Sequence, residues 1–320
     1  GNKVGYFPSL TAGWIVSDEG FFGESKVVNF LKLRGSYGIV GNDAIEPNGY
    51  VSQLNGEATY VFDGGIVNGR ATGQIPNPNL KWEQAKKLDI GLDVNLFNNK
   101  VNIVADYFVD TRVDLLIPGI PVSGILGAQA PGASSPTINA GTVRNEGLEF
   151  AVNYKKDFSD DFNISLGYNV TFLRNNVVEI NGADFLEGGV FGIGQPAPSR
   201  MEVGHSIGYF YGLKTNGVFQ NQAEVDAAPS QVGVGSKAST GDIRYVDVNG
   251  DGEISFDDRT DIGDPIPAAT MGFNIQLNYK SLDFSVYSFA SVGNDMIRNY
   301  ESISDDANRL TYALDRWTGE

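Results

Sequence analysis

The chain has 320 residues, of which 41% are hydrophobic and 19% are charged, and its formal net charge is −16. This acidity argues against nucleic acid as a partner. The absence of cysteine excludes disulfides, thiolate metal sites and cysteine nucleophiles. No apolar run approaches the roughly 18–20 residues that a membrane helix needs. If the protein meets a membrane, its strands must cross as a closed barrel, because open sheet edges are not tolerated in lipid.

In chain order, eight segments alternate apolar and polar residues and form four predicted hairpins. In the clearest segment, Leu88–Leu96, leucine, isoleucine and valine alternate with aspartate, glycine and asparagine. Such alternation gives a strand one apolar face and one face that can meet water. A strand that crosses a bilayer is tilted and has about 9–11 residues. The predicted hairpins pair Phe7–Ile15 with Phe30–Gly38, Leu88–Leu96 with Val101–Asp110, Leu148–Tyr154 with Ile164–Phe172, and Phe273–Tyr279 with Leu282–Val286.

The connections between these segments alternate between short and long. Within hairpins they are short or moderate, whereas 40–80, 115–142 and 175–267 are long. This alternation is typical of an outer-membrane barrel whose long loops lie outside the cell. We therefore expect an all-β fold in which residues 1–320 belong to one transmembrane antiparallel β-barrel domain and supply about eight of its strands. Residues 175–267 are expected to form one long extracellular loop region. A self-contained eight-stranded barrel with oversized loops is the alternative.

The most specific motif is the acidic segment 247–258, which matches the twelve-residue calcium-loop pattern except at its last position, where an aspartate replaces the usual glutamate. Gly252 occupies the position where the sharp turn needs positive φ, and Ile254 would anchor the loop by packing. Many oxygen ligands suit a hard cation such as Ca²⁺, and the short terminal aspartate predicts a loose site. The alternative is an acidic turn without an ion. The predicted metal ligands are Asp247, Asn249, Asp251, Glu253 through its backbone carbonyl, and Asp258.

No complete catalytic set is visible, and we expect no enzyme activity. The stretch 204–208 has the letters of a nucleophile elbow, but the flanking strand and helix are not evident. His205 is the only histidine and is badly placed as a base for its neighbour Ser206. No carboxylate spacing marks a glycosidase pair. Aromatic residues in predicted loops would stack on a sugar or peptide, or pack among themselves: Tyr50, Tyr60, Phe62, Phe191, Phe210 and Tyr211.

Short motifs occur in a fixed order along nearly the whole chain: Tyr6-Phe7-Pro8-Ser9, Gly13-Trp14, Leu31-Lys32-Leu33-Arg34-Gly35-Ser36-Tyr37-Gly38, Gly41-Asn42, Trp82-Glu83, Asp89-Ile90-Gly91-Leu92-Asp93, Asp106-Tyr107, Leu115-Leu116, Asn145-Glu146-Gly147-Leu148-Glu149, Gly217-Val218-Phe219-Gln220, Gly241-Asp242-Ile243-Arg244-Tyr245, the acidic segment, and Ile262-Gly263-Asp264-Pro265. This ordered set resembles the SusC/RagA-type TonB-dependent outer-membrane transporters of Bacteroidetes. The resemblance implies a 22-stranded barrel with an N-terminal plug, a TonB box and a SusD-like surface lipoprotein over the extracellular mouth.

Because no plug, TonB box or closing strand is evident, we expect the chain to be a segment of the C-terminal half of the barrel. We also expect a signal peptide to have been removed or to lie upstream in a longer chain.

Two functions follow from these expectations. The first is active import of a nutrient, an oligosaccharide or peptide, across the outer membrane, with TonB–ExbB–ExbD supplying the work. Its predicted partners are the SusD-like lipoprotein, outer-membrane lipid and the substrate. The second is a structural or adhesive surface barrel that binds other proteins through its long loops. An upstream plug and TonB box would favour the importer.

Overall fold

The structure is a computed structural model, and it describes residues 4–44, 51, 54, 56–71, 73, 75–117, 137–189, 196–235, 237–298, 310, 311, 314 and 316–319. The chain divides into two compact units. Unit 1 comprises Gly1–Asp184, Glu202–His205 and Ala268–Val292, and unit 2 comprises Phe185–Met201, Ser206–Pro267 and Gly293–Glu320. None of the helices in the described ranges has the length and apolar character of a membrane-spanning helix.

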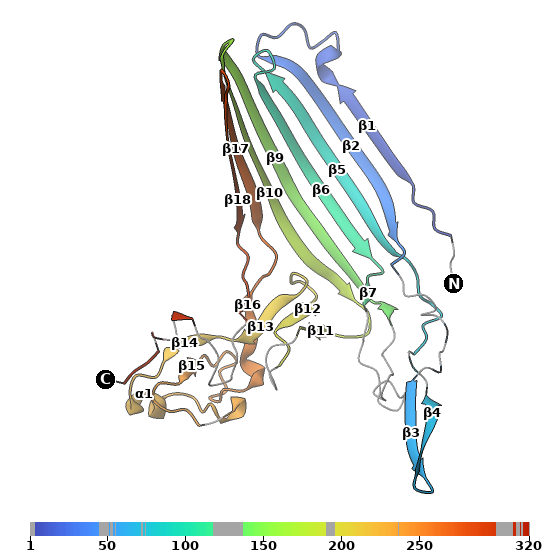
Figure 1. Ribbon diagram of the computed structural model, residues 1–320, viewed down its shortest axis with the longest axis vertical. Helices are drawn as coiled ribbons and strands as arrows, with labels where there is room; N and C mark the ends of the chain where they lie inside the picture. Colours follow the sequence, from blue (N-terminus) through green and yellow to red (C-terminus); the bar gives the residue numbers. More distant parts are fainter. Residues whose placement is uncertain are drawn as a thin grey trace. The chain divides into compact units, whose positions relative to one another are not determined.

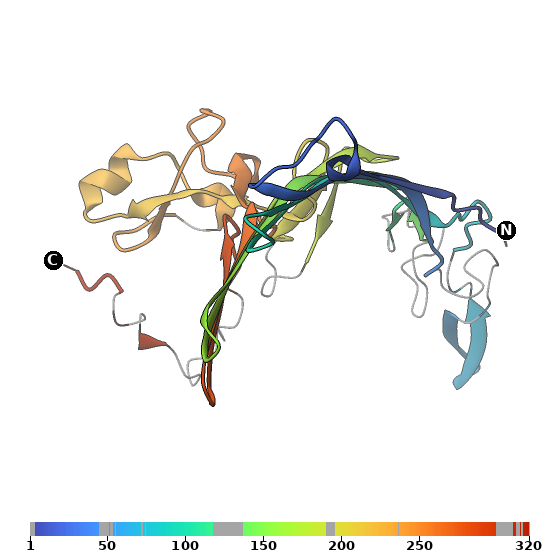
Figure 2. The same ribbon diagram turned by 90° about the horizontal axis from the view of Figure 1, so that it is seen from above.

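Unit 1 is built on an eight-stranded antiparallel sheet in the order β1-β2-β5-β6-β9-β10-β17-β18 (Figure 1). Every strand pairs with its neighbours in chain order, which confirms all four predicted hairpins. Seen from above, the sheet curves across its width (Figure 2). Its strands are β1 (Ser9–Ile15), β2 (Val28–Asn42), β5 (Glu83–Leu96), β6 (Val101–Val113), β9 (Gly141–Ser159), β10 (Phe162–Ile180), β17 (Ala269–Tyr279) and β18 (Leu282–Val292).

The register separates apolar from polar residues across the whole sheet. One transverse row contains only apolar residues: Trp14, Leu33, Leu92, Ala105, Phe150, Val170, Met271 and Ala290. The adjacent row, one residue along each strand, contains only polar residues and glycine: Gly13, Arg34, Gly91, Asp106, Glu149, Thr171, Thr270 and Ser291. Because side chains alternate across a strand, the two rows lie on opposite faces.

The apolar face of this sheet is open. Ile90 and Leu148 are each 55% exposed and Phe172 is 51% exposed. A water-soluble sheet would bury such a face against a second layer, whereas a barrel wall presents it to lipid. The fold class expected from the sequence, a segment of a transmembrane antiparallel β-barrel, is confirmed by this arrangement.

The turns within the hairpins lie at one end of the sheet (Figure 1). In the β5–β6 turn, Asn98 and Asn99 have φ of 59° and 61°, a left-handed conformation that asparagine tolerates better than most residues. The β9–β10 turn is shorter than predicted, because β9 continues to Ser159 and β10 starts at Phe162. The β1–β2 connection includes the 3₁₀ helix η1 (Val16–Asp18).

All three long connections contain strands of their own, and those of the third belong to unit 2. The predicted loop 40–80 includes a hairpin of β3 (Gly56–Phe62) and β4 (Gly65–Ala71), and the next loop includes β7 (Leu116–Ile117) paired with β8 (Ile138–Asn139). The third connection starts later than predicted. β10 pairs with β9 as far as Ile180, so the strand runs past Asn175, where the loop region was expected to begin.

Unit 2 contains a four-stranded sheet in the order β11-β12-β13-β16 and a pair formed by β14 and β15. Phe219 and Ile254 are fully buried and form its apolar centre. The short helix α1 begins after Asn221, whose side chain accepts a hydrogen bond from the backbone of Glu224. Its elements are β11 (Phe185–Gly188), β12 (Ser199–Glu202), β13 (Tyr209–Leu213), β14 (Thr215–Val218), α1 (Gln222–Ala227), η3 (Val232–Val234), β15 (Ile243–Tyr245), η4 (Phe256–Asp258) and β16 (Arg259–Gly263).

Candidate functional site

A charged cluster lies on the polar face of the sheet in unit 1. Arg34 of β2 donates from Nε to Asp93 (3.2 Å), from Nη1 to Asp89 (3.2 Å) and from Nη2 to Asp106 (2.7 Å). One guanidinium therefore bridges three carboxylates on β5 and β6, and the cluster keeps an excess of negative charge. Carboxylates on this face are compatible with a water-filled interior and would be penalised in lipid.

A row of amides crosses the same face nearer the turns. Asn102 donates to Asn95 (2.8 Å), and Asn153 donates to Asn102 (3.5 Å). The row continues through Gly167 to Asn274 on β17. Such a row offers neutral donors and acceptors, so the polar face has both a charged and an uncharged sector.

The acidic loop, residues 247–258, lies in unit 2 and folds around backbone amides. Asp247 accepts from the amides of Gly250 (2.7 Å) and Gly252 (2.9 Å), and Asp251 accepts from the amide of Glu253 (2.9 Å). Gly252 has φ of 89°, as the motif predicts. Ile254 is fully buried, which confirms its predicted anchoring role.

The loop closes on the fully buried carboxylate of Asp258. One oxygen accepts from the amides of Val248 (2.9 Å) and Asn249 (3.3 Å), and the other accepts from the amide of Ser255 (2.8 Å). The bond from Ser255 is the largest cause that lowers the pKa of Asp258; burial opposes it, and the other two amides add to the lowering. The carboxylate is thus held ionised as the centre of the loop.

Within the described ranges, no group of three or more His, Cys, Asp or Glu side chains is arranged to hold a metal ion. The structure brings the predicted ligands Asp247, Asn249, Asp251, Glu253 and Asp258 into one loop, where hydrogen bonds to backbone amides occupy the carboxylates of the first, third and last. Because all the available donors are oxygens, their chemistry suits Ca²⁺. Calcium binding by this loop remains a prediction.

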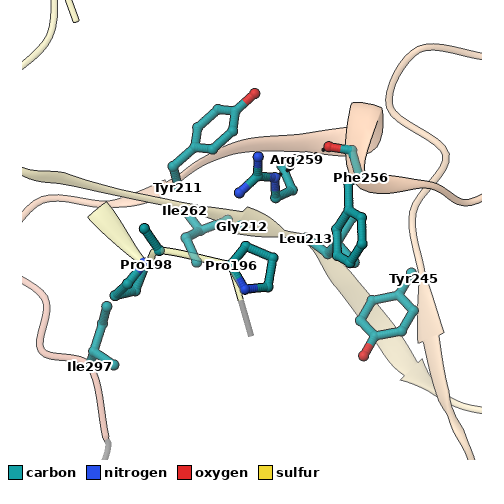
Figure 3. Close-up of a pocket in the computed structure, with 11 residues that line it drawn as sticks. Pro196, Pro198, Tyr211, Gly212, Leu213, Tyr245, Phe256, Arg259, Ile262 and Ile297 are labelled. Atoms are coloured by element: carbon teal, nitrogen blue, oxygen red, sulfur yellow. Dashed lines mark hydrogen bonds between the residues drawn. The ribbon is translucent and has the colours of Figure 1, made fainter. Parts of the chain in front are cut away.

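An apolar pocket of about 270 Å³ adjoins the acidic loop (Figure 3). Phe256 belongs to the loop, and Tyr245 and Arg259 stand just outside its two ends. Tyr211 and Leu213 come from β13. Two prolines and two isoleucines complete most of the wall: Pro196, Pro198, Ile262 and Ile297. We call this cavity the Tyr211 pocket.

Beside this pocket, the buried guanidinium of Arg200 and the partly buried guanidinium of Arg259 share one carboxylate. Arg200 and Arg259 each donate to the same oxygen of Glu187 at 3.2 Å. Arg200 also stacks 3.5 Å from the ring centre of Tyr211, a cation–π contact. The three ionic side chains together carry one net positive charge. Arg259 Nη1 is buried and has no hydrogen-bond partner among the described residues.

The stretch 204–208 is a turn, as expected, and not a nucleophile elbow. Gly204 and Gly208 have φ of 93° and 74°, and the Ser206 hydroxyl donates to Asp264. Of the predicted loop aromatics, Tyr211 lines the pocket, whereas Tyr50 and Phe191 lie outside the described residues. Sequence reasoning did not single out Arg200, Arg259 or Glu187.

An antiparallel sheet with an open apolar face and an opposite ionic face defines a segment of an outer-membrane barrel wall. A family model described as "TonB dependent receptor-like, beta-barrel" matches residues 2–318. The chain therefore belongs to the TonB-dependent receptor β-barrel family, whose members lie in the outer membrane.

Its relatives confirm the resemblance to SusC/RagA-type receptors. The chain is 34% identical over 324 residues to TonB-dependent receptor P26 of Formosa agariphila, covering 100% of this chain and 32% of that receptor. It is 30% identical over 326 residues to TonB-dependent receptor SusC of Bacteroides thetaiotaomicron, covering 98% and 30%. A solved structure of the RagAB peptide transporter shares the fold, with a TM-score of 0.70 and 22% identity over 90% of this chain and 29% of that one. The chain thus spans about a third of the length of these relatives.

Proposed function

We propose that the whole protein actively imports a nutrient, an oligosaccharide or a peptide, across the outer membrane. The observation that carries this proposal is the pair of adjacent rows on opposite faces of the sheet, one of apolar residues only and one of polar residues and glycine. A barrel wall built in this way has a lipid-facing exterior and a wet interior through which a polar substrate can pass. The Arg34 cluster and the amide row would line that path.

The long connections would lie outside the cell, where they meet a SusD-like surface lipoprotein and part of the substrate. The turns within the hairpins share one end of the sheet (Figure 1), and the rule that short turns are periplasmic supports the proposal that this end faces the periplasm. TonB–ExbB–ExbD would act through a plug outside the segment described here. This assembly is supported by the family that the chain shares with SusC and by the fold that it shares with a peptide transporter.

Calcium binding by the acidic loop is a further part of the proposal. Asp247, Asn249, Asp251 and Asp258 would supply side-chain oxygens, and Glu253 its backbone carbonyl. The bound ion would stiffen the loop and so hold its neighbours in place.

Import is tested by uptake from a mixture of oligosaccharides and peptides, measured as depletion of each compound from the medium by mass spectrometry. Cells lacking the gene and cells lacking TonB should fail to deplete the same compounds that the parent strain takes up. Unchanged depletion in both strains, together with lost surface attachment to other proteins, would favour an adhesive barrel.

A further inference from the structure

The apolar face of the sheet in unit 1 gives way to basic side chains at the end away from the hairpin turns. Along β10 this face presents an unbroken series of apolar and aromatic residues: Phe162, Ile164, Leu166, Tyr168, Val170 and Phe172. The next residue on the same face is Arg174. It lies directly opposite Glu146 of β9. The alternation of the strand therefore continues, but its outward side chains become charged.

The apolar series matches the thickness of the hydrocarbon layer. From Phe162 to Phe172 the strand advances about 33 Å, at about 3.3 Å per residue. At a tilt of about 40° this length corresponds to about 25 Å of depth, which is the height of the apolar band on an outer-membrane barrel. Arg174 therefore lies at the level of the lipid head groups, just beyond the acyl chains.

Two rows of paired residues on this face form what we call the Arg174 patch. All of its residues belong to unit 1. Within these two rows of described residues there are three basic side chains and one carboxylate, that of Glu146. Glu179 is on the same face one row farther out, opposite Thr142. The row next to the apolar series contains Leu88, Val109, Glu146 and Arg174, and the following row contains Lys86, Thr111, Arg144 and Asn176.

Two of the three basic side chains have no ion-pair partner. Arg144 pairs with Glu146 at 2.7 Å. Arg174 and Lys86 are exposed and make no hydrogen bond or ion pair with any residue that the structure describes. Their charged groups are therefore accessible to a ligand that approaches from outside the sheet.

We propose that the Arg174 patch binds the phosphate of a lipid in the outer leaflet of the outer membrane, with an acyl chain along the apolar residues below it. Guanidinium groups match the geometry of phosphate oxygens, and basic side chains at the membrane surface attract anionic lipids. The outer leaflet follows from the proposed periplasmic position of the hairpin turns, which lie at the other end of the sheet (Figure 1). This inference goes beyond nutrient import and does not depend on it.

The geometry of the patch suits an amphiphile. Neighbouring strands lie about 4.8 Å apart, so Lys86 and Arg144, which are separated by β6, border a space about 10 Å wide. Only Thr111 lies between them in the ladder, and its short side chain adds a hydroxyl donor. Directly below the row of Arg174, Leu148 and Phe172 face each other and are 55% and 51% exposed, as an acyl-chain contact requires.

The test uses the full receptor, purified with its lipoprotein in a neutral detergent, and native mass spectrometry of bound lipid. Dioleoyl phosphatidic acid supplies a phosphate and acyl chains, and dioleoyl phosphatidylcholine supplies the same chains with no net charge. The wild type should bind the phosphatidic acid about tenfold or more tightly, because each basic residue near an anionic lipid contributes about fivefold to its affinity. Arg174→Gln should reduce this preference about fivefold, and the double variant with Lys86→Gln should abolish it.

Lys87→Gln is the matched control, because Lys87 is the chain neighbour of Lys86 and lies on the opposite face, where it pairs with Asp110 at 3.2 Å. This variant should keep the wild-type preference. Thermal unfolding of each variant shows whether it is folded, and Arg144→Gln replaces a single variant that is not.

Three results would overturn the proposal. The first is a preference for phosphatidic acid that is absent in the wild type, survives the double variant or is lost equally in Lys87→Gln. The second is displacement of the phosphatidic acid by an equimolar amount of inorganic phosphate, which would show that the acyl chains contribute nothing. The third is loss of the lipoprotein from the double variant with unchanged lipid preference, which would assign the patch to that protein partner.

These results are separate from those for import. TonB-dependent depletion of compounds without any preference for phosphatidic acid leaves import standing and rejects the lipid site. Selective lipid binding without depletion supports the lipid site and rejects import.

Discussion

Gly91 of β5 lies directly opposite Asp106 of β6 in the antiparallel ladder, and the missing side chain makes room for a guanidinium. A Cβ at Gly91 would approach an oxygen of Asp106 and come within 2.5 Å of Cζ of Arg34. The glycine is therefore a condition for gathering three carboxylates around one arginine on the polar face.

Gly91→Ala should destabilise the folded barrel by about 1–3 kcal/mol, as is typical when extra volume is forced into a packed site. The shift can be measured as a lower denaturant midpoint of the purified receptor. Gly20→Ala is the control, because nothing lies within 4 Å of a Cβ built at Gly20. Equal midpoints for the two variants would show that the cluster does not depend on this space.

Phe172→Arg and Thr171→Arg place the same charge at neighbouring positions on opposite faces of β10. Arginine on the lipid face costs about 2–4 kcal/mol at the middle of the bilayer, so Phe172→Arg should sharply reduce assembly. At Thr171 the new charge would stand beside Glu149, which that threonine already contacts at 3.5 Å, and assembly should stay near the wild-type level. The amount of folded receptor in outer-membrane fractions measures both, and similar losses would mean that the faces are assigned wrongly.

Asp258→Asn should destabilise the acidic loop at neutral pH, because an amide cannot accept all three backbone hydrogen bonds. The folded pKa of Asp258 is lowered, so its contribution to stability is fully present above the ordinary carboxyl pKa of 3.8 and is lost as the pH falls through that value toward the folded pKa. The stability difference between wild type and Asp258→Asn should therefore shrink only in this acidic range. Hydrogen exchange of the loop measures it, with the exposed neighbour substitution Asp257→Asn as a control that should have little effect.

Calcium should raise the stability of unit 2, and chelation should lower it. At a free calcium concentration one hundred times Kd, one specific site stabilises the folded state by about 2.7 kcal/mol. Asp251→Ala should abolish the response seen by thermal unfolding of the receptor. Identical unfolding with calcium and with chelator, and no metal in the purified protein, would remove the calcium site.

The hairpins were predictable because lipid on one side and water on the other impose strict alternation on each strand. The ends of β9 and β10 were not, since around Arg174 and Asn175 polar residues occupy consecutive positions while the ladder hydrogen bonds continue. The β3–β4 hairpin was missed for a related reason. Its residues Tyr60–Phe62 are all apolar or aromatic, so they carry no period of two, although Asp63 and Gly64 form a recognisable turn.

The fold of the acidic loop was also predictable, because the residues of its motif are close together in the sequence. The Tyr211 pocket was not, because its members come from distant segments. The ion pair beside the pocket shows the same: Glu187 lies on β11 and Arg259 on β16, and the four-stranded sheet brings them within 3.2 Å. No sequence spacing encodes that contact, although the aromatic residue Tyr211 did stand out by itself.

The central claim is that one face of this sheet meets lipid and the other meets water. Because the chain contains no cysteine, single substitutions from Leu166→Cys to Phe172→Cys along β10 can be labelled in outer membranes with a water-soluble and a lipid-soluble thiol reagent. Odd-numbered positions should react with the water-soluble reagent and even-numbered positions only with the lipid-soluble one. Reactivity without this two-residue period, or with the faces reversed, would contradict the account.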